Sequence, residues 1–184
     1  MAKNNEAVHS SFWANVFKTP ADRIDLEKSL LAIPPFQSLN KRELDLLFSV
    51  IHNRSYLANE CIFQQGDPGI GLYIIREGEV RVERKDESGT TIQLAHLRKG
   101  DFFGELALVD GEKRSASSIA LTDCRLAVIF KPDLDEFIEK YPKKGIKILQ
   151  GISHIMAIRL RNLNEDYFNQ VSKTKLKSGG NYGT

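Results

Sequence analysis

The segment 101–116 combines residues that could bind a phosphate and a sugar. Gly104 lacks a side chain, so the backbone there can approach a ligand closely. The Glu-Leu-Ala-Leu run at 105–108 can form one helical turn whose free N–H groups attract an anion, and Arg114 adds a planar, permanently charged guanidinium. The Glu105 carboxylate would repel a phosphate, so we expect it to face a neutral donor such as a ribose hydroxyl. A phosphate beside a ribose predicts a nucleotide ligand.

A simpler interpretation is a surface salt bridge between Glu105 and Arg114 that closes an ordinary loop. For a lone Gly-Glu pair followed by a distant arginine, this would be the better interpretation. The ordered run at 104–108 together with Arg-Ser-Ala at 114–116 is more specific than a single glycine motif and favours the ligand site.

Phe-Gly-Glu-Leu-Ala-Leu at 103–108, followed by Arg-Ser-Ala at 114–116, resembles the phosphate-binding cassette of the cyclic nucleotide-binding domain family. The resemblance implies that Glu105 holds the ribose 2′-hydroxyl and that Arg114 holds the cyclic phosphate. It implies further contacts from the backbone at Gly104, Leu106, Ala107 and Ser115. A second similar stretch covers 62–78, so the resemblance extends over roughly residues 36–164, most of the chain.

The resemblance says less about the base of the ligand. In bacterial members of the family, adjacent hydroxyl residues on a long helix hold the adenine, and the corresponding residues here are Leu163 and Asn164. Leu163 cannot form a hydrogen bond, whereas Asn164 offers a donor and an acceptor to a purine edge. Arg159 aligns with a helix arginine that approaches the nucleotide. Ser115, where threonine would be the alternative, favours cyclic AMP, with cyclic GMP as the alternative ligand.

The composition is that of one ordinary globular domain with appendages. The 184 residues are 41% hydrophobic and 27% charged, and the net charge of +2 is smaller than a dedicated nucleic-acid-binding protein usually carries. No apolar run is long enough to span a bilayer, so we expect a cytoplasmic protein without membrane contact. Cys61 and Cys124 lie in separate strand-like runs and are expected to be buried, reduced thiols. No metal-ligand or nucleophile motif is present, so we expect neither a metal site nor enzymatic activity.

The hydrophobic periodicity predicts short strands that form a sandwich or a jelly roll between helices, and the resemblance implies an α+β fold with an antiparallel β jelly roll flanked by helices. The strand-like stretches alternate with period two and are bounded by turn residues. They are residues 72–75, 80–83, 91–94 and 118–121. The predicted organisation is an N-terminal helical extension (1–35), the β-roll domain (36–141), a long C-terminal helix (142–171) and a disordered tail (172–184).

The C-terminal helix is predicted to carry an apolar stripe broader than one β domain can cover. The stripe has three- and four-residue steps and consists of Leu149, Ile152, Met156, Leu160, Leu163, Tyr167 and Val171. We expect this helix to act as a lid on the ligand and to pair with its twin in a homodimer. A monomer with one wide apolar face is the alternative.

These observations predict a cyclic nucleotide receptor, most simply for cyclic AMP, that signals through conformational change to a protein partner. A fold-retaining interaction module that has lost nucleotide binding is the alternative. The polar, basic segment 173–184 is too short for a helix-turn-helix, so no specific DNA binding is expected. The aromatic face of Phe12, Trp13, Val16 and Phe17 is expected to pack on its own domain or a sister subunit, with partner docking as the rival function.

Overall fold

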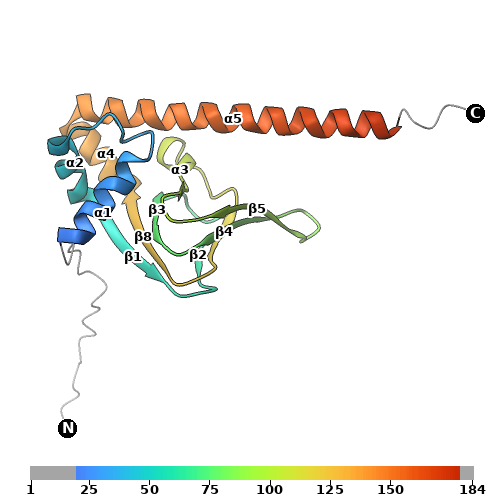
Figure 1. Ribbon diagram of the computed structural model, residues 1–184, viewed down its shortest axis with the longest axis horizontal. Helices are drawn as coiled ribbons and strands as arrows, with labels where there is room; N and C mark the ends of the chain where they lie inside the picture. The colour runs from blue at the N-terminus through green and yellow to red at the C-terminus, as the bar shows by residue number, and fades with distance from the viewer. Residues whose placement is uncertain (1–19, 179–184) are drawn as a thin grey trace, which may run out of the picture.

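The computed structural model describes residues 20–178, which form a β-roll with helices along one side (Figure 1). The helices are α1 (Pro20–Leu31), α2 (Lys41–Leu47), the 3-10 helix η2 (Phe48–Val50), α3 (Leu106–Val109), α4 (Lys131–Lys140) and α5 (Pro142–Ser178). The strands are β1 (Ile51–Tyr56), β2 (Cys61–Phe63), β3 (Gly71–Glu77), β4 (Val80–Lys85), β5 (Thr91–Leu97), β6 (Phe102–Phe103), β7 (Ser117–Ala120) and β8 (Cys124–Phe130).

The strands form two four-stranded antiparallel sheets with the orders β1-β8-β3-β6 and β2-β7-β4-β5. Chain neighbours such as β1 and β2 therefore lie in different sheets, as a jelly roll requires. This arrangement confirms the predicted α+β jelly roll with its long C-terminal helix. The strands predicted at 72–75, 80–83, 91–94 and 118–121 correspond to β3, β4, β5 and β7.

Two hydrophobic clusters share the central strands β3 and β8. One face of these strands, with Leu72, Ile74 and Ile129, packs against the helices, and the other, with Ile75 and Leu126, faces the second sheet. Both faces are buried, which explains why the sequence of β3 is a continuous apolar run and does not alternate between apolar and polar residues. Strand β6, which lies within the segment 101–116, pairs with β3 and so anchors that segment to a strand buried on both faces.

Local sequence signals define two of the helix starts. Asn40 caps α2 in a capping box, in which its side chain accepts from the Glu43 N–H at 3.0 Å and the Glu43 carboxylate accepts from the Asn40 N–H at 2.9 Å. Pro132 lies in the first turn of α4, where its missing N–H has no partner to lose.

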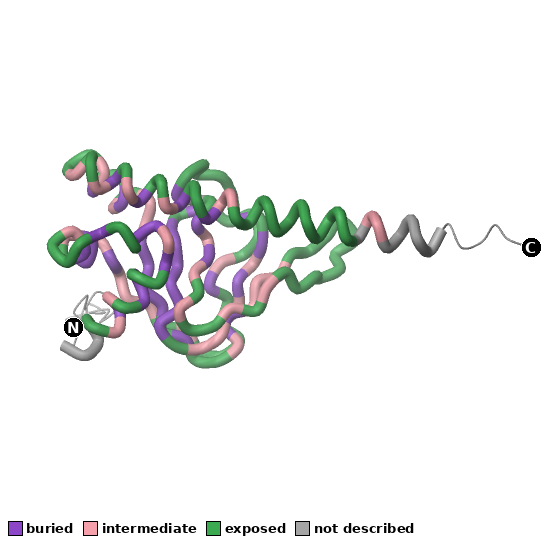
Figure 2. The backbone as a smooth tube through the Cα atoms, turned by 45° about the horizontal axis from the view of Figure 1, so that its top comes forward, coloured by how far each residue is buried: buried purple, intermediate pink, exposed green. Residues whose placement is uncertain are grey.

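Helix α5 packs on the domain only through its first half. Ile148, Ile152 and Ile155 are buried against α4 and the N-terminal helices, whereas residues 159–169 are exposed where the helix passes the roll (Figure 2). The helix extends to Ser178, whereas we predicted its end at Val171 and a disordered tail from residue 172. Residues 172–178 contain no glycine or proline, and the first strong breaker is the Gly179-Gly180 pair.

Three further expectations concern the aromatic face, the cysteines and membrane-spanning helices. The predicted aromatic face at 12–17 lies outside the described residues. Both cysteines are free thiols, but the expected burial of Cys61 is wrong: it is exposed on β2, because strand alternation turns its neighbour Ile62 inward, and only Cys124 is buried. Among residues 20–178, no helix combines the length and the apolar composition needed to cross a bilayer.

Candidate functional site

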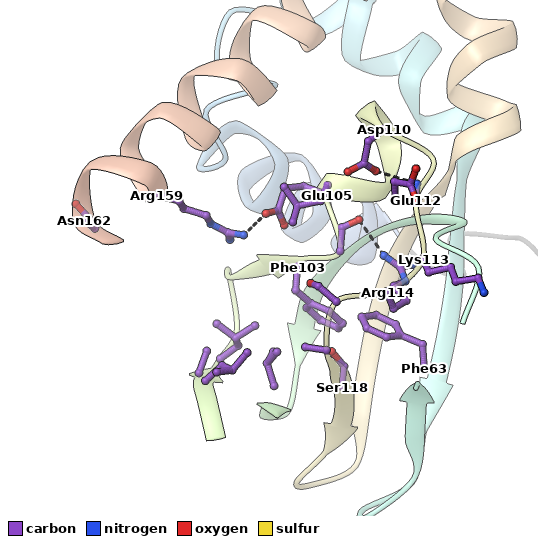
Figure 3. Close-up of a pocket in the computed structure, with 18 residues that line it drawn as sticks. Phe63, Phe103, Glu105, Asp110, Glu112, Lys113, Arg114, Ser118, Arg159 and Asn162 are labelled. Carbon is purple, nitrogen blue, oxygen red and sulfur yellow. Dashed lines mark hydrogen bonds and ion pairs between the residues drawn. The ribbon is translucent and has the colours of Figure 1, made fainter. Parts of the chain in front are cut away.

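The cassette segment borders a cavity of about 730 Å³ between the open end of the roll and α5 (Figure 3). Its walls come from β4, β5, β7, the cassette and one face of α5. The lining residues are Phe63, Val82, Leu94, Ala95, Leu97, Phe103, Gly104, Glu105, Leu106, Asp110, Glu112, Lys113, Arg114, Ser115, Ala116, Ser118, Arg159 and Asn162. The volume lies in the range of small-molecule sites, and the walls combine apolar strands with a polar cassette.

Arg114 is a buried cation fixed by backbone carbonyls. It is 6% exposed, and its Nη1 and Nη2 donate to Gly104 O at 3.0 Å and Gly71 O at 2.9 Å. Its guanidinium carbon lies 4.1 Å from the centre of the Phe63 ring. Burial lowers the pKa of Arg114 from its ordinary value, while Tyr73 and Glu105 oppose that shift. Its Nε has no hydrogen-bond partner among the described residues, so the site retains an unpaired donor on a fixed positive charge.

Gly104 allows this placement of Arg114. Its φ is +77°, a conformation that residues with a side chain rarely adopt, and a Cβ there would lie 2.6 Å from Arg114 Nη1 and 2.9 Å from Gly71 O. A side chain at this position would displace the guanidinium from its carbonyl partners. The glycine predicted for close backbone approach therefore makes room for the cation itself.

Glu105 precedes α3 and is 3% exposed. The Leu108 N–H donates to Glu105 O at 3.0 Å, so the N–H groups of residues 106 and 107 precede the first hydrogen bond of the turn. The Glu105 carboxylate forms an ion pair with Arg159 of α5, whose side chain is 48% exposed. Arg159 Nη2 also donates to Phe102 O at 3.3 Å. One arginine therefore connects α5 to two residues at the start of the cassette, one before and one after Gly104.

This geometry excludes the simple salt bridge between Glu105 and Arg114. Glu105 pairs with Arg159, Arg114 is held by carbonyl oxygens, and both side chains are buried. Two buried polar side chains held by separate partners at the same cavity are typical of a binding site and not of a surface loop closure.

The predicted site residues mostly come together. Gly104, Glu105, Leu106, Arg114, Ser115 and Arg159 all line the cavity, and the side chain of Ala107 lies outside the described ones. Asn164 is absent from the lining and borders a separate depression of about 420 Å³ with Glu165, Phe168 and Asn169. At 3.6 residues per turn, Asn164 lies about 140° around α5 from Arg159, whereas Asn162 lies only about 60° away.

Outside the segment 101–116, sequence reasoning missed two polar residues of the cavity, Asn162 and Ser118. Asn162 follows Arg159 by three residues, a spacing that places both on one helix face. Ser118 follows Ala116 by two residues, a spacing that turns both to the same side of an extended strand. Both positions could therefore have been identified from the spacing to a residue already singled out.

Comparison with known proteins identifies the family that this part of the chain resembles. The family model described as "Cyclic nucleotide-binding domain" matches residues 53–141, which include the whole cassette. Residues 53–141 therefore form a domain of the cyclic nucleotide-binding domain family. It is 36% identical to a cyclic AMP receptor protein of Thermus thermophilus over 128 residues, which cover 70% of this chain and 57% of that protein. The chain thus spans little more than half of this relative.

Solved structures of family members extend the likeness to the fold. A cyclic nucleotide-binding domain from Methylobacillus flagellatus aligns with a TM-score of 0.72 and 25% identity, covering 82% of this chain and 85% of that one. The regulatory domain of Toxoplasma gondii PKA, solved with cyclic AMP, aligns with a TM-score of 0.61 and 26% identity, covering 65% of this chain and 45% of that one. The β-roll and its flanking helices are therefore a shared framework.

Proposed function

We propose that this protein is a receptor for a cyclic nucleotide, with cyclic AMP as its preferred ligand. The observation that carries the proposal is the pair of buried groups at one cavity, Arg114 with its unpaired Nε and the Glu105 carboxylate. Arg114 and the N–H groups that begin α3 supply positive potential for a phosphate, and Glu105 supplies an acceptor for the ribose 2′-hydroxyl. The apolar strand walls leave room for the base.

The preference for cyclic AMP is supported by two relatives. The Thermus thermophilus protein is named a cyclic AMP receptor protein, and the Toxoplasma gondii structure contains cyclic AMP. Ser115, which follows Arg114 and lines the cavity, agrees with that preference, with cyclic GMP as the alternative ligand. The role of the site is binding and release, and we propose no catalytic step.

Ligand binding would change the position of α5 through Arg159. In the structure Arg159 pairs with Glu105, so a ribose hydroxyl that hydrogen-bonds to Glu105 alters the group that holds α5 to the cassette. A ligand shifts a conformational equilibrium only through different contacts in the two states, and this shared carboxylate provides such a difference. We propose that a protein effector reads the resulting position of α5.

The rival function is an interaction module that keeps the fold without binding a nucleotide. Calorimetric titration with cyclic AMP separates the two functions. The receptor requires saturable heat at a stoichiometry of one ligand per chain, whereas the module requires none. The buried Arg114 with its unpaired Nε favours the receptor. A buried charge with an unpaired donor lowers the stability of the fold, and a phosphate ligand would supply the missing partner.

We also propose that the exposed half of α5 pairs with a second copy of the chain. Leu160, Leu163 and Tyr167 are 58%, 64% and 68% exposed and follow one another at helical spacing. Multi-angle light scattering should give the mass of a dimer, and Leu163→Glu should shift it towards a monomer while Asn169→Glu does not. A wild-type monomer at high concentration, with and without ligand, would refute the dimer.

A further inference from the structure

Ser118 on β7 carries a buried hydroxyl without a partner. The residue is 0% exposed, and its Oγ has no hydrogen-bond partner among the described residues. Buried side-chain hydroxyls are nearly always paired, so an unpaired one requires an explanation. Ser118 also lines the cavity that contains Glu105 and Arg114. A ligand in that cavity could supply the missing partner.

The surroundings of Ser118 are apolar. It lies opposite Val82 in the β4 register and opposite Phe63 in the β2 register, and Val82, Phe63 and Phe103 also line the cavity. In Figure 3, Ser118 lies below Phe103, while Glu105 and Arg159 lie above it. The hydroxyl is therefore a polar group within the apolar part of the wall, separate from the charged cassette.

The position along β7 indicates which part of a nucleotide Ser118 would meet. Arg114 and the start of α3 account for the phosphate, and Glu105 accounts for the ribose. Ser118 lies two residues beyond Ala116 on the same side of the strand, about 7 Å farther from the cassette. There it faces the β4–β5 side of the cavity, where Val82, Leu94 and Leu97 form the wall. Since the phosphate and the ribose are already assigned to other residues, we expect the base to lie beside this wall.

We propose that the Ser118 hydroxyl hydrogen-bonds to the base of the bound nucleotide and contributes to its selectivity. This inference rests on the proposed function, and it adds a base contact from the β-roll to any contact from α5. A serine hydroxyl can donate and accept, so it can serve a ring nitrogen or an exocyclic group of a purine. Because Ser118 is buried and the wall around it is otherwise apolar, a base that leaves the hydroxyl unpaired binds less well.

The matched pair Ser118→Thr and Ser118→Val tests this inference, because the two side chains share one shape and differ in the hydroxyl. Calorimetric titration of each variant with cyclic AMP and cyclic GMP gives four dissociation constants. We expect Ser118→Val to bind cyclic AMP about fivefold to tenfold more weakly than Ser118→Thr, with a changed ratio between the two nucleotides. Equal affinities in the two variants, or an equal loss for both nucleotides, would overturn the base contact.

Two controls keep the test decisive. Ser117→Ala changes the neighbouring serine of β7, whose Oγ accepts from the Gln65 N–H at 2.9 Å and which does not line the cavity, so selectivity should stay unchanged. Ser118→Ala replaces the valine variant if the larger side chain prevents folding, as judged by thermal unfolding. Wild-type protein that binds no cyclic nucleotide refutes the proposed function; wild-type binding with unchanged selectivity in the Ser118 variants refutes only this inference.

Discussion

Replacing Arg114 with alanine should weaken cyclic AMP binding by about 30-fold to 150-fold, which corresponds to about 2–3 kcal/mol. The variant removes the proposed charge-assisted hydrogen bond to the phosphate, which comes from a buried guanidinium. Gly104 O and Gly71 O also lose their donor, and the Phe63 ring loses the stacked guanidinium. The dissociation constant from calorimetry measures the first effect, and urea unfolding measures the second.

Two further variants separate charge from geometry. Arg114→Lys keeps the positive charge but cannot donate to both carbonyls from one plane, so its affinity should lie between those of wild type and Arg114→Ala. Arg98→Ala removes an exposed arginine whose ion pair with Glu79 is 3.9 Å long and which does not line the cavity. Its affinity should stay within about twofold of wild type at physiological salt. An Arg114→Ala variant that binds as tightly as Arg98→Ala would contradict the assigned phosphate site.

Gly151→Ala should destabilise the protein more than the other glycine-to-alanine change in α5, Gly145→Ala. A Cβ there would lie 2.1 Å from Pro35 Cα and 2.9 Å from Pro34 O, so the turn after α1 or the helix itself must move. Overpacking of this kind costs about 1–3 kcal/mol or more, and the gain of about 1 kcal/mol from helix propensity only partly offsets it. Urea unfolding followed by circular dichroism should show a lower midpoint.

Gly145→Ala provides the matched comparison, since it is the same change six residues earlier in α5. Its new Cβ would meet only side-chain atoms of Ile138, the nearest at 2.7 Å. Because a side chain can shift with less disturbance than a backbone segment, the loss should be smaller than for Gly151→Ala. Equal stability of the two variants would show that the close contact with Pro35 does not hold α5 to the N-terminal helices.

Features carried by local sequence were predicted well. The cassette depends on Gly104, Glu105 and Arg114 at fixed spacing, so a short window of sequence is enough to identify it. Strands β3, β4, β5 and β7 were identified because turn residues bound each apolar stretch. These local patterns do not depend on how distant parts of the chain pack.

Features that depend on tertiary packing were predicted less well. The pairing of Glu105 with Arg159 joins residues 54 positions apart, and no local pattern distinguishes it from a pair between Glu105 and Arg114. The inward side of β7 places Ser118 in the cavity only because β7 lies between β2 and β4. The exposure of Cys61 follows from the register of a three-residue strand, which is too short for periodicity to define.

The most direct test of the receptor is a calorimetric titration of wild-type protein with cyclic AMP, 2′-deoxy cyclic AMP and the non-cyclic 5′-monophosphate. We predict saturable binding of cyclic AMP, weaker binding of the 2′-deoxy analogue because Glu105 loses its hydroxyl partner, and the weakest binding for the 5′-monophosphate. The difference between the first two ligands should disappear in Glu105→Ala, which leaves no side-chain acceptor for the hydroxyl. No heat and no thermal shift with millimolar cyclic AMP or cyclic GMP would contradict the receptor function.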